Sequence, residues 1–403
     1  MLYIVSSTIK RYKAVIFEYP RIEAKDREVL EMIRNLRKEL RYQVNVNPVR
    51  WTGFLRRNTF ARALQGSNSI EGYNATLAEA VAIADDEKPE TLEEEAAKAL
   101  MGYRTAMTYI LRLHDDPHAE VNAQFIRSLH FMMLNYDMEK LPGQWRPGAI
   151  SVVREPSGDV VYEGPDADLI PGLIDELVKQ IKSVDAVDSS TVLAAMAHLN
   201  LTMIHPFRDG NGRMARALQT LVLARNGVVS PVFCSIEEWL GRNTGAYYHI
   251  LGEVGQGSWH PKRNALPWIR FCLVAHYQQA ATLMRRNAVI GRMFGEVEKI
   301  RKEQSLPERV EIALMDAAFN YRVRNVRYRE ENQISDVVAS RDLKRLTELG
   351  WLLSVGEKRG RYYIASPALR KIRERCGDDT RAGNPYEMIE AKPKRDQFSL
   401  PGV

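Results

Sequence analysis

The chain contains little cysteine, no long apolar run and no excess of glycine or proline. Its three cysteines, Cys234, Cys272 and Cys376, lie far apart without a CxxC pair, which argues against a disulfide framework or a cysteine-rich zinc site and favours a reducing compartment. The most apolar stretch, residues 192–204, contains a histidine and an asparagine and is shorter than the roughly 20 apolar residues of a membrane span. The N-terminus does not resemble a secretory signal. We therefore expect a soluble, cytoplasmic protein without contact to membranes.

Charge of both signs is plentiful. The 403 residues include 57 Lys plus Arg and 51 Asp plus Glu, for a net charge of +6, and 45% of the residues are hydrophobic. This composition excludes collagen-like, low-complexity and globally disordered chains. At roughly 100–200 residues per domain, the length predicts two or three folded domains.

Helical periodicity dominates the chain and predicts a mainly α fold. Thr91 and Glu94 have the spacing of a capping box, and apolar residues follow at intervals of three and four. Polar caps and a terminal glycine mark the other predicted helices. These begin near Asn122, at Asp188 or Ser189, and near Asn211, and the last two end near Ile204 and Gly227.

Two segments depart from this helical pattern. Residues 143–163 contain two β-rich runs around a Pro-Ser-Gly-Asp turn, which predicts a hairpin. From about residue 306, helices near 308–319 and 335–349 precede a second hairpin, and this order resembles a small α+β winged-helix module. Residues 321–361 contain 10 Lys or Arg and 6 Asp or Glu, a net +4. The chain beyond residue 366 is charged and interrupted by proline and glycine, so we expect it to be loosely ordered.

Residues 205–216, His-Pro-Phe-Arg-Asp-Gly-Asn-Gly-Arg-Met-Ala-Arg, lie between two predicted helices. Gly210 and Gly212 allow backbone conformations in which successive N–H groups turn inward where the next helix begins. The positive end of that helix favours anions. The GxxxxGK[ST] spacing of a P-loop is absent. The segment therefore predicts a phosphate cradle of another kind.

The side chains around this cradle suit phosphate chemistry. His205 is able to take a proton from an attacking hydroxyl near neutral pH, and Asp209 is able to hold a hard cation such as Mg²⁺ against phosphate oxygens. Arg213 and Arg216 are three residues apart on the first helical turn, so their guanidinium groups point to the same side. A single histidine or loop aspartate is more often structural, and it is their combination here that points to catalysis.

The segment matches every specified position of HxFx(D/E)GNGRxxR, and the chain here resembles the Fic family. The resemblance implies a helical core in which the histidine deprotonates a hydroxyl of a target protein. The oxygen then attacks the α-phosphorus of ATP, AMP stays on the target and pyrophosphate leaves. The resemblance makes His205 the base and Asp209 the ligand of Mg²⁺, with Phe207 buried. It assigns Gly210, Asn211 and Gly212 to the α/β-phosphates and Arg213 and Arg216 to the β/γ-phosphates.

The resemblance also gives roles to segments on either side of the motif. In Fic proteins a hairpin flap aligns the target by backbone pairing, a mode of recognition that ignores side-chain identity; a plain surface hairpin is the alternative. The corresponding flap residues here are Ala149, Ile150, Ser151 and Val152. Asn243, Tyr247 and Tyr248 resemble the segment that lines the adenine pocket, although tyrosines at helical positions are more often core residues.

Residues 67–72, Ser-Asn-Ser-Ile-Glu-Gly, resemble the inhibitory (S/T)xxxE(G/N) motif of the second Fic class. Its first position is Ser67 and its glutamate is Glu71. A carboxylate paired with Arg216 would remove the cation that the γ-phosphate needs and would occupy its space. The resemblance therefore implies that Glu71 inhibits the enzyme. The alternative is a Ser-capped helix with a surface glutamate.

Together these features predict five regions. They are an N-terminal region over 1–91 with the inhibitory motif, a Fic core over 92–251, a helical connector over 252–304, a winged-helix domain over 305–366 and a tail over 367–403. The resemblance implies an ATP-dependent protein adenylyltransferase and favours a homodimer. Neither the target protein nor its acceptor residue, Ser, Thr or Tyr, follows from the sequence.

Two other functions stay open. Some Fic relatives transfer other phosphate groups or remove AMP, although Gly212 favours nucleotidyl transfer because the phosphate-transferring relatives lack this glycine. The second alternative is a nucleotide-sensing regulator that binds DNA through its winged helix. Residues 340–345 would then form the recognition helix and Lys358, Arg359 and Arg361 the wing.

Overall fold

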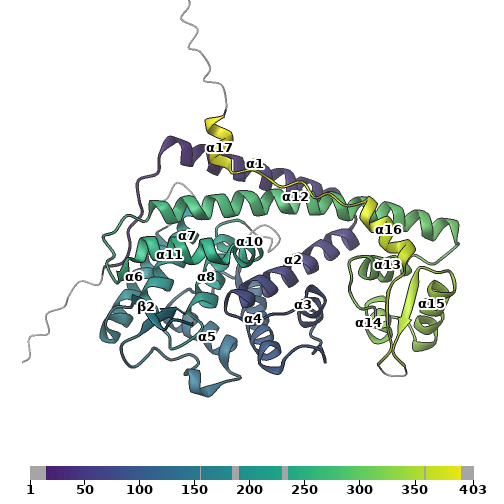
Figure 1. The fold of residues 1–403 in the computed structure, drawn as a ribbon, viewed down its shortest axis with the longest axis horizontal. Helices are drawn as coiled ribbons and strands as arrows, with labels where there is room; N and C mark the ends of the chain where they lie inside the picture. Colours follow the sequence, from purple (N-terminus) through teal and green to yellow (C-terminus); the bar gives the residue numbers. More distant parts are fainter. Residues whose placement is uncertain (1–14, 155, 184–189, 229–234, 358–359, 392–403) are drawn as a thin grey trace, which may run out of the picture. The chain divides into compact units, whose positions relative to one another are not determined.

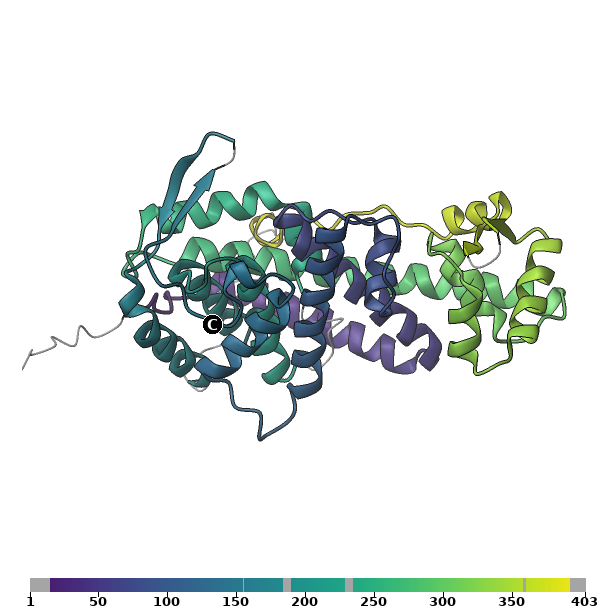
Figure 2. The same cartoon turned by 90° about the horizontal axis from the view of Figure 1, so that it is seen from below.

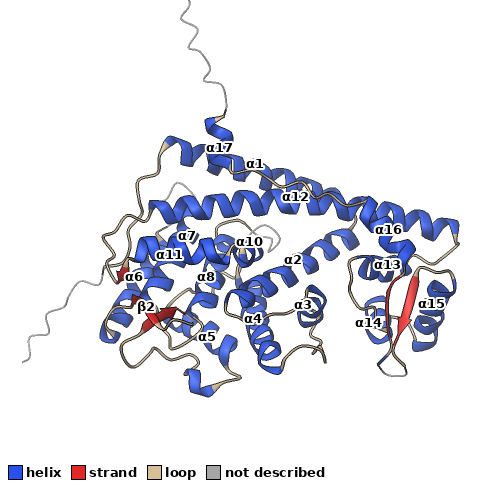
Figure 3. Cartoon of the chain, in the orientation of Figure 1, coloured by secondary structure: helices blue, strands red, loops and turns tan. Residues whose placement is uncertain are grey.

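The computed structural model describes residues 15–154, 156–183, 190–228, 235–357 and 360–391. The chain divides into two compact units: the first comprises the residues up to 22, 105–227 and 245–271, and the second comprises 23–104, 228–244 and 272 onward. Helices make up most of both units, as Figures 1 and 3 show. The predicted mainly α class is confirmed. In the part of the chain that the structure describes, no helix combines the length and the apolar character needed to cross a membrane.

The first unit is built around α7 (Ser190–Ile204) and α8 (Asn211–Arg225). In α7 only Ser190 and Thr202 are not buried, as expected of a helix that is apolar on all sides. Helix α7 packs against α8 and α6 (Ile170–Lys182), and α6 also packs against α5 (Ala123–Leu134). The loop that carries the Fic-like motif is therefore held at both ends by buried helices.

The helix ends show which predicted caps form. The side chain of Asn122 caps α5 by accepting the Phe125 amide at 2.8 Å, as predicted. Helix α8 ends shortly before Gly227, whose φ is +85°. The capping box predicted at Thr91 is wrong: α4 (Glu94–Leu113) starts three residues later, and the Thr91 hydroxyl donates to Glu79 instead. The predicted cap of α7 at 188 or 189 lies outside the described residues.

The predicted hairpin is confirmed as β1 (Ser151–Arg154) and β2 (Asp159–Glu163), which pair antiparallel with Val152 opposite Tyr162. Strand β3 (Gly257–Ser258) extends β2 in parallel, so β1 is an edge of this three-stranded sheet. Figure 2 shows the hairpin standing out from the helices of the first unit. At its base the Tyr162 hydroxyl donates to the Met203 carbonyl of α7 at 2.8 Å. The base is therefore fixed to α7, whereas one strand edge is open for pairing.

The second unit contains three helices from the N-terminal part of the chain, α1 (Ala24–Val46), α2 (Val49–Ile70) and α3 (Leu77–Ala84). Helix α2 packs against α3 and against α10 (Glu237–Arg242). The contact with α10 is so close that a Cβ at Gly66 would lie 2.3 Å from the Glu237 carbonyl oxygen. Glycine at this position therefore allows the two helices to approach. The longest element is α12 (Leu266–Glu303), with 38 residues; it and α4 contribute residues to both units.

The C-terminal module of the second unit, residues 306–365, contains the two predicted helices and the hairpin in the predicted order, with one further helix between the two. Helices α13 (Val310–Ala318), α14 (Asn325–Asn332) and α15 (Asp336–Glu348) precede the antiparallel strands β4 (Leu352–Val355) and β5 (Tyr362–Ala365). The Ser335 side chain caps α15, at the predicted start of that helix. Helix α14 was not predicted. The identity of this module as a winged helix stays a prediction.

The predicted loosely ordered tail is wrong for residues 367–391, which contain α16 (Pro367–Arg375) and α17 (Pro385–Glu390). Ser366 and Asn384 cap these helices, and a proline follows each cap, a combination that initiates helices. Helix α16 buries Leu369 completely. Helix α17 packs on α1, where Tyr386 donates to Asp26 at 2.9 Å. Proline here starts helices rather than preventing them.

Candidate functional site

His205 lies directly after α7 and has a φ of +50°, a region that few residues other than glycine adopt. Its amide still donates to the Leu201 carbonyl at 3.0 Å, as in a helix. Its Nδ1 lies 3.1 Å from the Thr202 carbonyl. Since a carbonyl only accepts, Nδ1 must carry the proton in the neutral ring. The lone pair is therefore on Nε2, and this is the nitrogen able to act as a base.

Phe207 anchors the loop in the protein core, as predicted. It is fully buried and stacks on His130, with ring centroids 3.7 Å apart. The Nδ1 of His130 accepts the Gly143 amide at 2.8 Å, and its Nε2 donates to the Asp209 carbonyl at 2.9 Å. Burial lowers the pKa of His130 to about 4, so this imidazole is neutral. No local pattern indicates this role of His130, because Asp209 lies 79 residues further along the chain.

The carboxylate of Asp209 is surrounded by positive groups. Its Oδ2 lies 3.1 Å from Lys140 Nζ and 3.8 Å from Arg213 Nη2, and its Oδ1 accepts the Gly210 amide at 2.5 Å. Burial by itself would raise the pKa of Asp209, but Arg213, Lys140 and the Gly210 amide outweigh it and lower the pKa. The side chain is therefore ionised at neutral pH. Lys140 is a second site residue that the sequence did not indicate.

An ionised Asp209 suits a hard cation, but it cannot hold one alone. Among the described residues no group of three His, Cys, Asp or Glu side chains is placed to bind a metal ion. Mg²⁺ commonly binds through one or two carboxylates together with phosphate oxygens and water. The donor set here therefore fits Mg²⁺ that arrives with a nucleotide rather than a metal held by protein side chains alone.

Gly210 and Asn211 shape the predicted phosphate cradle. Gly210 is the N-cap of α8 with a φ of +76°, which glycine adopts without strain. The Asn211 side chain accepts the Phe207 amide and donates to the Phe207 carbonyl, both at 2.9 Å. This amide side chain therefore closes the loop, and a contribution of Asn211 to anion binding would come from its backbone N–H at the start of α8.

Arg213 and Arg216 follow on the first turn of α8. Their exposed fractions are 0% and 2%, so both side chains are buried. Buried positive charges have a stronger electrostatic effect than exposed ones because water screens them less. Together with the start of α8, they make this end of the helix attractive to a polyanion. Contacts of the two arginines with β- and γ-phosphates stay a prediction.

The residues predicted to line an adenine pocket are not equivalent. Tyr247 is buried, and its hydroxyl lies 3.0 Å from His198 Nε2, within the core. Tyr248 is 50% exposed, and its ring centroid lies 5.4 Å from that of Tyr247. Asn243 ends α10, and its side chain donates to the Trp239 carbonyl at 2.8 Å. Tyr247 therefore serves the core, and an adenine-binding role for these residues stays a prediction.

His198 makes a pH-dependent contribution to stability. Complete burial lowers its pKa from 6.5 to about 3; the hydrogen bond with Gln219 opposes this shift, and the charge of Arg216 adds to it. The folded state thus binds fewer protons than the unfolded state below pH 6.5, so the free energy of unfolding falls as the pH drops. At pH 5 the expected loss is about 2 kcal/mol relative to neutral pH.

Urea unfolding of the wild type and of His198→Gln at pH 7 and pH 5 measures this contribution. The difference between the two pH values should be about 2 kcal/mol smaller in the variant. The exposed His118 provides the control, because His118→Gln should leave the difference unchanged. An equal pH dependence in all three proteins would contradict a neutral, buried His198.

The inhibitory segment forms the end of α2. Ser67 and Asn68 are buried within the helix, and Glu71 is its C-cap. The alternative of a Ser-capped helix is therefore wrong. The Asn68 carbonyl accepts the amides of Glu71 and Tyr73, each at 3.0 Å, and the φ of Gly72 is +86°. This turn fixes the backbone of Glu71. Its pairing with Arg216 stays a prediction.

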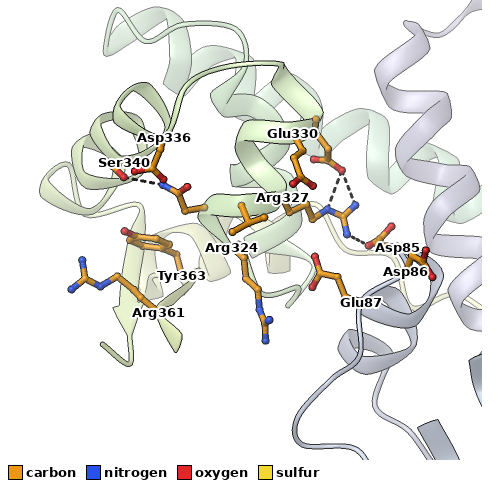
Figure 4. A pocket seen from close by; sticks show the side chains of 13 residues that line it. Asp85, Asp86, Glu87, Arg324, Arg327, Glu330, Asp336, Ser340, Arg361 and Tyr363 are labelled. Carbon is orange, nitrogen blue, oxygen red and sulfur yellow. Dashed lines mark hydrogen bonds and ion pairs between the residues drawn. The ribbon is translucent and has the colours of Figure 1, made fainter. Parts of the chain in front are cut away.

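A cleft of about 840 Å³ lies in the second unit, between the turn after α3 and the C-terminal module. Figure 4 shows Arg327 of α14 reaching toward Asp85. Arg327 also pairs with Glu331 at 2.7 Å, and Arg57 joins Asp85 at 3.0 Å and Asp316 at 2.8 Å. No histidine is among the described residues that line this cleft. Its ion pairs link α2 to the C-terminal module and do not form a catalytic arrangement.

Helix α15 contains the predicted recognition segment. Arg341, Lys344 and Arg345 are exposed, whereas Asp342 faces inward and accepts from Arg309 at 2.6 Å. Arg361 lines the cleft just described, and the predicted wing residues 358 and 359 lie outside the described residues. An exposed basic helix face is compatible with DNA and is also common on protein surfaces. DNA binding stays a prediction.

Comparison with known proteins gives a family match that includes the motif. Residues 120–223 match the model of the Fic/DOC family. A protein adenylyltransferase of Caenorhabditis elegans is 26% identical over 253 residues, which are 60% of this chain and 45% of that protein. One of Nematostella vectensis is 24% identical over 264 residues, 62% of this chain and 55% of that protein. The chain thus spans about half the length of these curated relatives.

Solved structures share the fold. A Fic family protein from Desulfovibrio desulfuricans has a TM-score of 0.55 at 20% identity, over 87% of this chain and 99% of that one. A Fic domain containing signaling protein from Bacteroides thetaiotaomicron has a TM-score of 0.53 at 18% identity, over 66% of this chain and 97% of that one. The similarity to the first structure extends well beyond the segment that matches the family model.

Proposed function

The chain belongs to the Fic/DOC family, and on that premise we propose that it is a protein adenylyltransferase, which transfers AMP from ATP to a hydroxyl group of a target protein. One observation carries this proposal: the Nδ1–H of His205 is committed to the Thr202 carbonyl at 3.1 Å. This leaves Nε2 as the base, at the end of α7 and five residues before Gly210, the αL glycine that caps α8. The loop thus places a base next to the N-terminus of a helix, which favours anions, and this combination suits attack on a phosphate.

The proposed reaction is an in-line displacement at the α-phosphorus. The target oxygen forms a bond to this phosphorus as its proton passes to Nε2 of His205, and the bond to the bridging oxygen of the β-phosphate breaks. Pyrophosphate leaves and AMP stays on the target. The start of α8 with Arg213 and Arg216 stabilises the triphosphate. Magnesium, held by Asp209 together with phosphate oxygens, would neutralise charge on the leaving pyrophosphate.

The edge strand β1 provides a place for the target. Ser151 and Val152 lie in β1, at the edge of its sheet, and Ala149 and Ile150 precede it. An extended segment of the target pairs with such an edge through its own backbone, which would bring a neighbouring hydroxyl to His205. We further propose that Glu71 inhibits the reaction by pairing with Arg216. A homodimer and a cytoplasmic location stay predictions.

ATP labelled separately at the α- and γ-phosphorus tests the reaction class. After incubation of the Glu71→Gly variant with Mg²⁺ and each form of ATP, we expect protein-bound radioactivity only from the α-label. Tryptic mass spectrometry should find an added AMP group on a Ser, Thr or Tyr. Protein-bound γ-label would instead identify a phosphotransferase. Release of AMP from a modified protein, without any incorporation, would identify the reverse activity.

A further inference from the structure

Arg146, in the segment between η1 (Met138–Lys140) and β1, bonds to three backbone carbonyls through its side chain. Its Nε donates to the His205 carbonyl at 2.8 Å, its Nη1 to the Gly148 carbonyl and its Nη2 to the Pro165 carbonyl. Its own backbone amide donates to the Pro206 carbonyl at 2.9 Å. Four hydrogen bonds thus connect one residue to two separate parts of the first unit.

The two connected parts are the hairpin and the loop that follows α7, which begins with His205. Gly148 lies three residues before β1 and Pro165 two residues after β2, so Arg146 bonds to both feet of the hairpin. The feet also bond to each other, because the Gly164 amide donates to the Ile150 carbonyl at 3.1 Å. On the other side, Arg146 bonds to the backbone of His205 and Pro206. Arg146 therefore holds the backbone of His205, the proposed base, and both feet of the hairpin flap.

The environment of Arg146 shows that this contact is costly and specific. Only 4% of the residue is exposed, and within the described residues its bonds go to carbonyl oxygens rather than to a carboxylate. Burying a guanidinium without an ion pair is unfavourable unless its N–H groups are satisfied. The planar fork reaches three carbonyls in different directions, which the single nitrogen of a lysine cannot do. The arrangement therefore requires arginine rather than any positive charge.

We propose that Arg146 is a positioning residue that sets the distance between the flap-bound target hydroxyl and Nε2 of His205. This inference rests on the proposed transfer reaction. The His205 carbonyl, held by Arg146, belongs to a residue with positive φ, so its orientation depends on its contacts. A shift of about 1 Å between reacting groups lowers a rate by about 100-fold. Nucleotide binding, which depends on the start of α8 and its arginines, does not need this contact.

The test compares Arg146→Lys with Arg127→Lys, in the wild type and in the Glu71→Gly background. Arg127 is a matched control because its Nε donates to the Gly143 carbonyl of the same segment at 2.7 Å, and among the described residues it has no hydrogen bond to the hairpin feet or His205. For Arg146→Lys we expect transfer at saturating ATP to fall about 100-fold, with the Kd for ATP unchanged within about twofold. Arg127→Lys should change neither quantity by more than about twofold.

Hydrogen exchange gives a readout that does not depend on activity. In Arg146→Lys the Gly164 amide at the feet of the hairpin should exchange at least about tenfold faster, while amides inside α7 should not change. If the parent protein transfers nothing, the proposed function fails, and exchange alone then decides the role of Arg146. Unchanged exchange at Gly164, or transfer at the parent rate, would overturn the proposal. So would an equal loss of ATP binding, or unfolding of both Arg146→Lys and Arg146→Gln, because either result would make the role generally structural.

Discussion

Substitution of His205 by alanine should abolish AMP transfer while the protein still binds ATP. In the proposed reaction the imidazole is the base, and its Nδ1–H donates to the Thr202 carbonyl at 3.1 Å, which leaves the lone pair on Nε2. Removal of a general base lowers a rate by about 100- to 10,000-fold. The start of α8 and its arginines, which are proposed to bind the phosphates, stay in place. The effect should therefore appear in the transfer rate and not in the Kd for ATP.

Transfer is measured as protein-bound α-label in the Glu71→Gly background, and ATP binding by calorimetry with a non-hydrolysable analogue. His118→Ala is the control, because His118 is exposed and lies in the same unit. It should match the parent in both measurements. Undiminished transfer by His205→Ala would show that another group takes the proton. Loss of ATP binding in step with transfer would show that His205 mainly supports the loop.

Local signals explain why much of the site was predictable from the sequence. The glycines of the loop and the Asn122 cap act within a few residues of themselves, so their structural effect is visible in the sequence. The hairpin likewise follows from two β-rich runs around one turn. In each case the structure has the predicted element close to the predicted residues.

The parts that were not predictable depend on partners far along the chain. His130 and Lys140 lie some 70 to 80 residues before Asp209. In the folded chain, His130 donates to the Asp209 carbonyl and Lys140 pairs with the Asp209 carboxylate. Arg146 similarly reaches His205 across 59 residues. A lone arginine or histidine has no local pattern that distinguishes such a role. The prediction of a loosely ordered tail failed for a different reason. A proline after a capping residue initiates a helix even in a charged segment.

Substitution of Glu71 by glycine should raise self-modification strongly. Glu71 is the C-cap of α2, and backbone hydrogen bonds of that last turn fix its main chain. A charge-assisted hydrogen bond contributes about 1.5–3 kcal/mol. If Glu71 holds Arg216 away from the γ-phosphate, its removal should increase transfer roughly 10- to 100-fold, as that energy implies. Incorporation of α-labelled AMP into the protein itself is the measurement.

Two further variants separate charge from backbone. Glu71→Gln keeps the shape of the side chain but loses its charge, and it should recover most of the increase if ion pairing is the cause. Glu303→Gly is the matched control, because Glu303 is an exposed glutamate at the end of α12, and it should leave labelling unchanged. If glycine at position 71 activates and glutamine does not, the inhibition acts through space filling or the C-cap turn. If neither variant activates, Glu71 does not inhibit transfer.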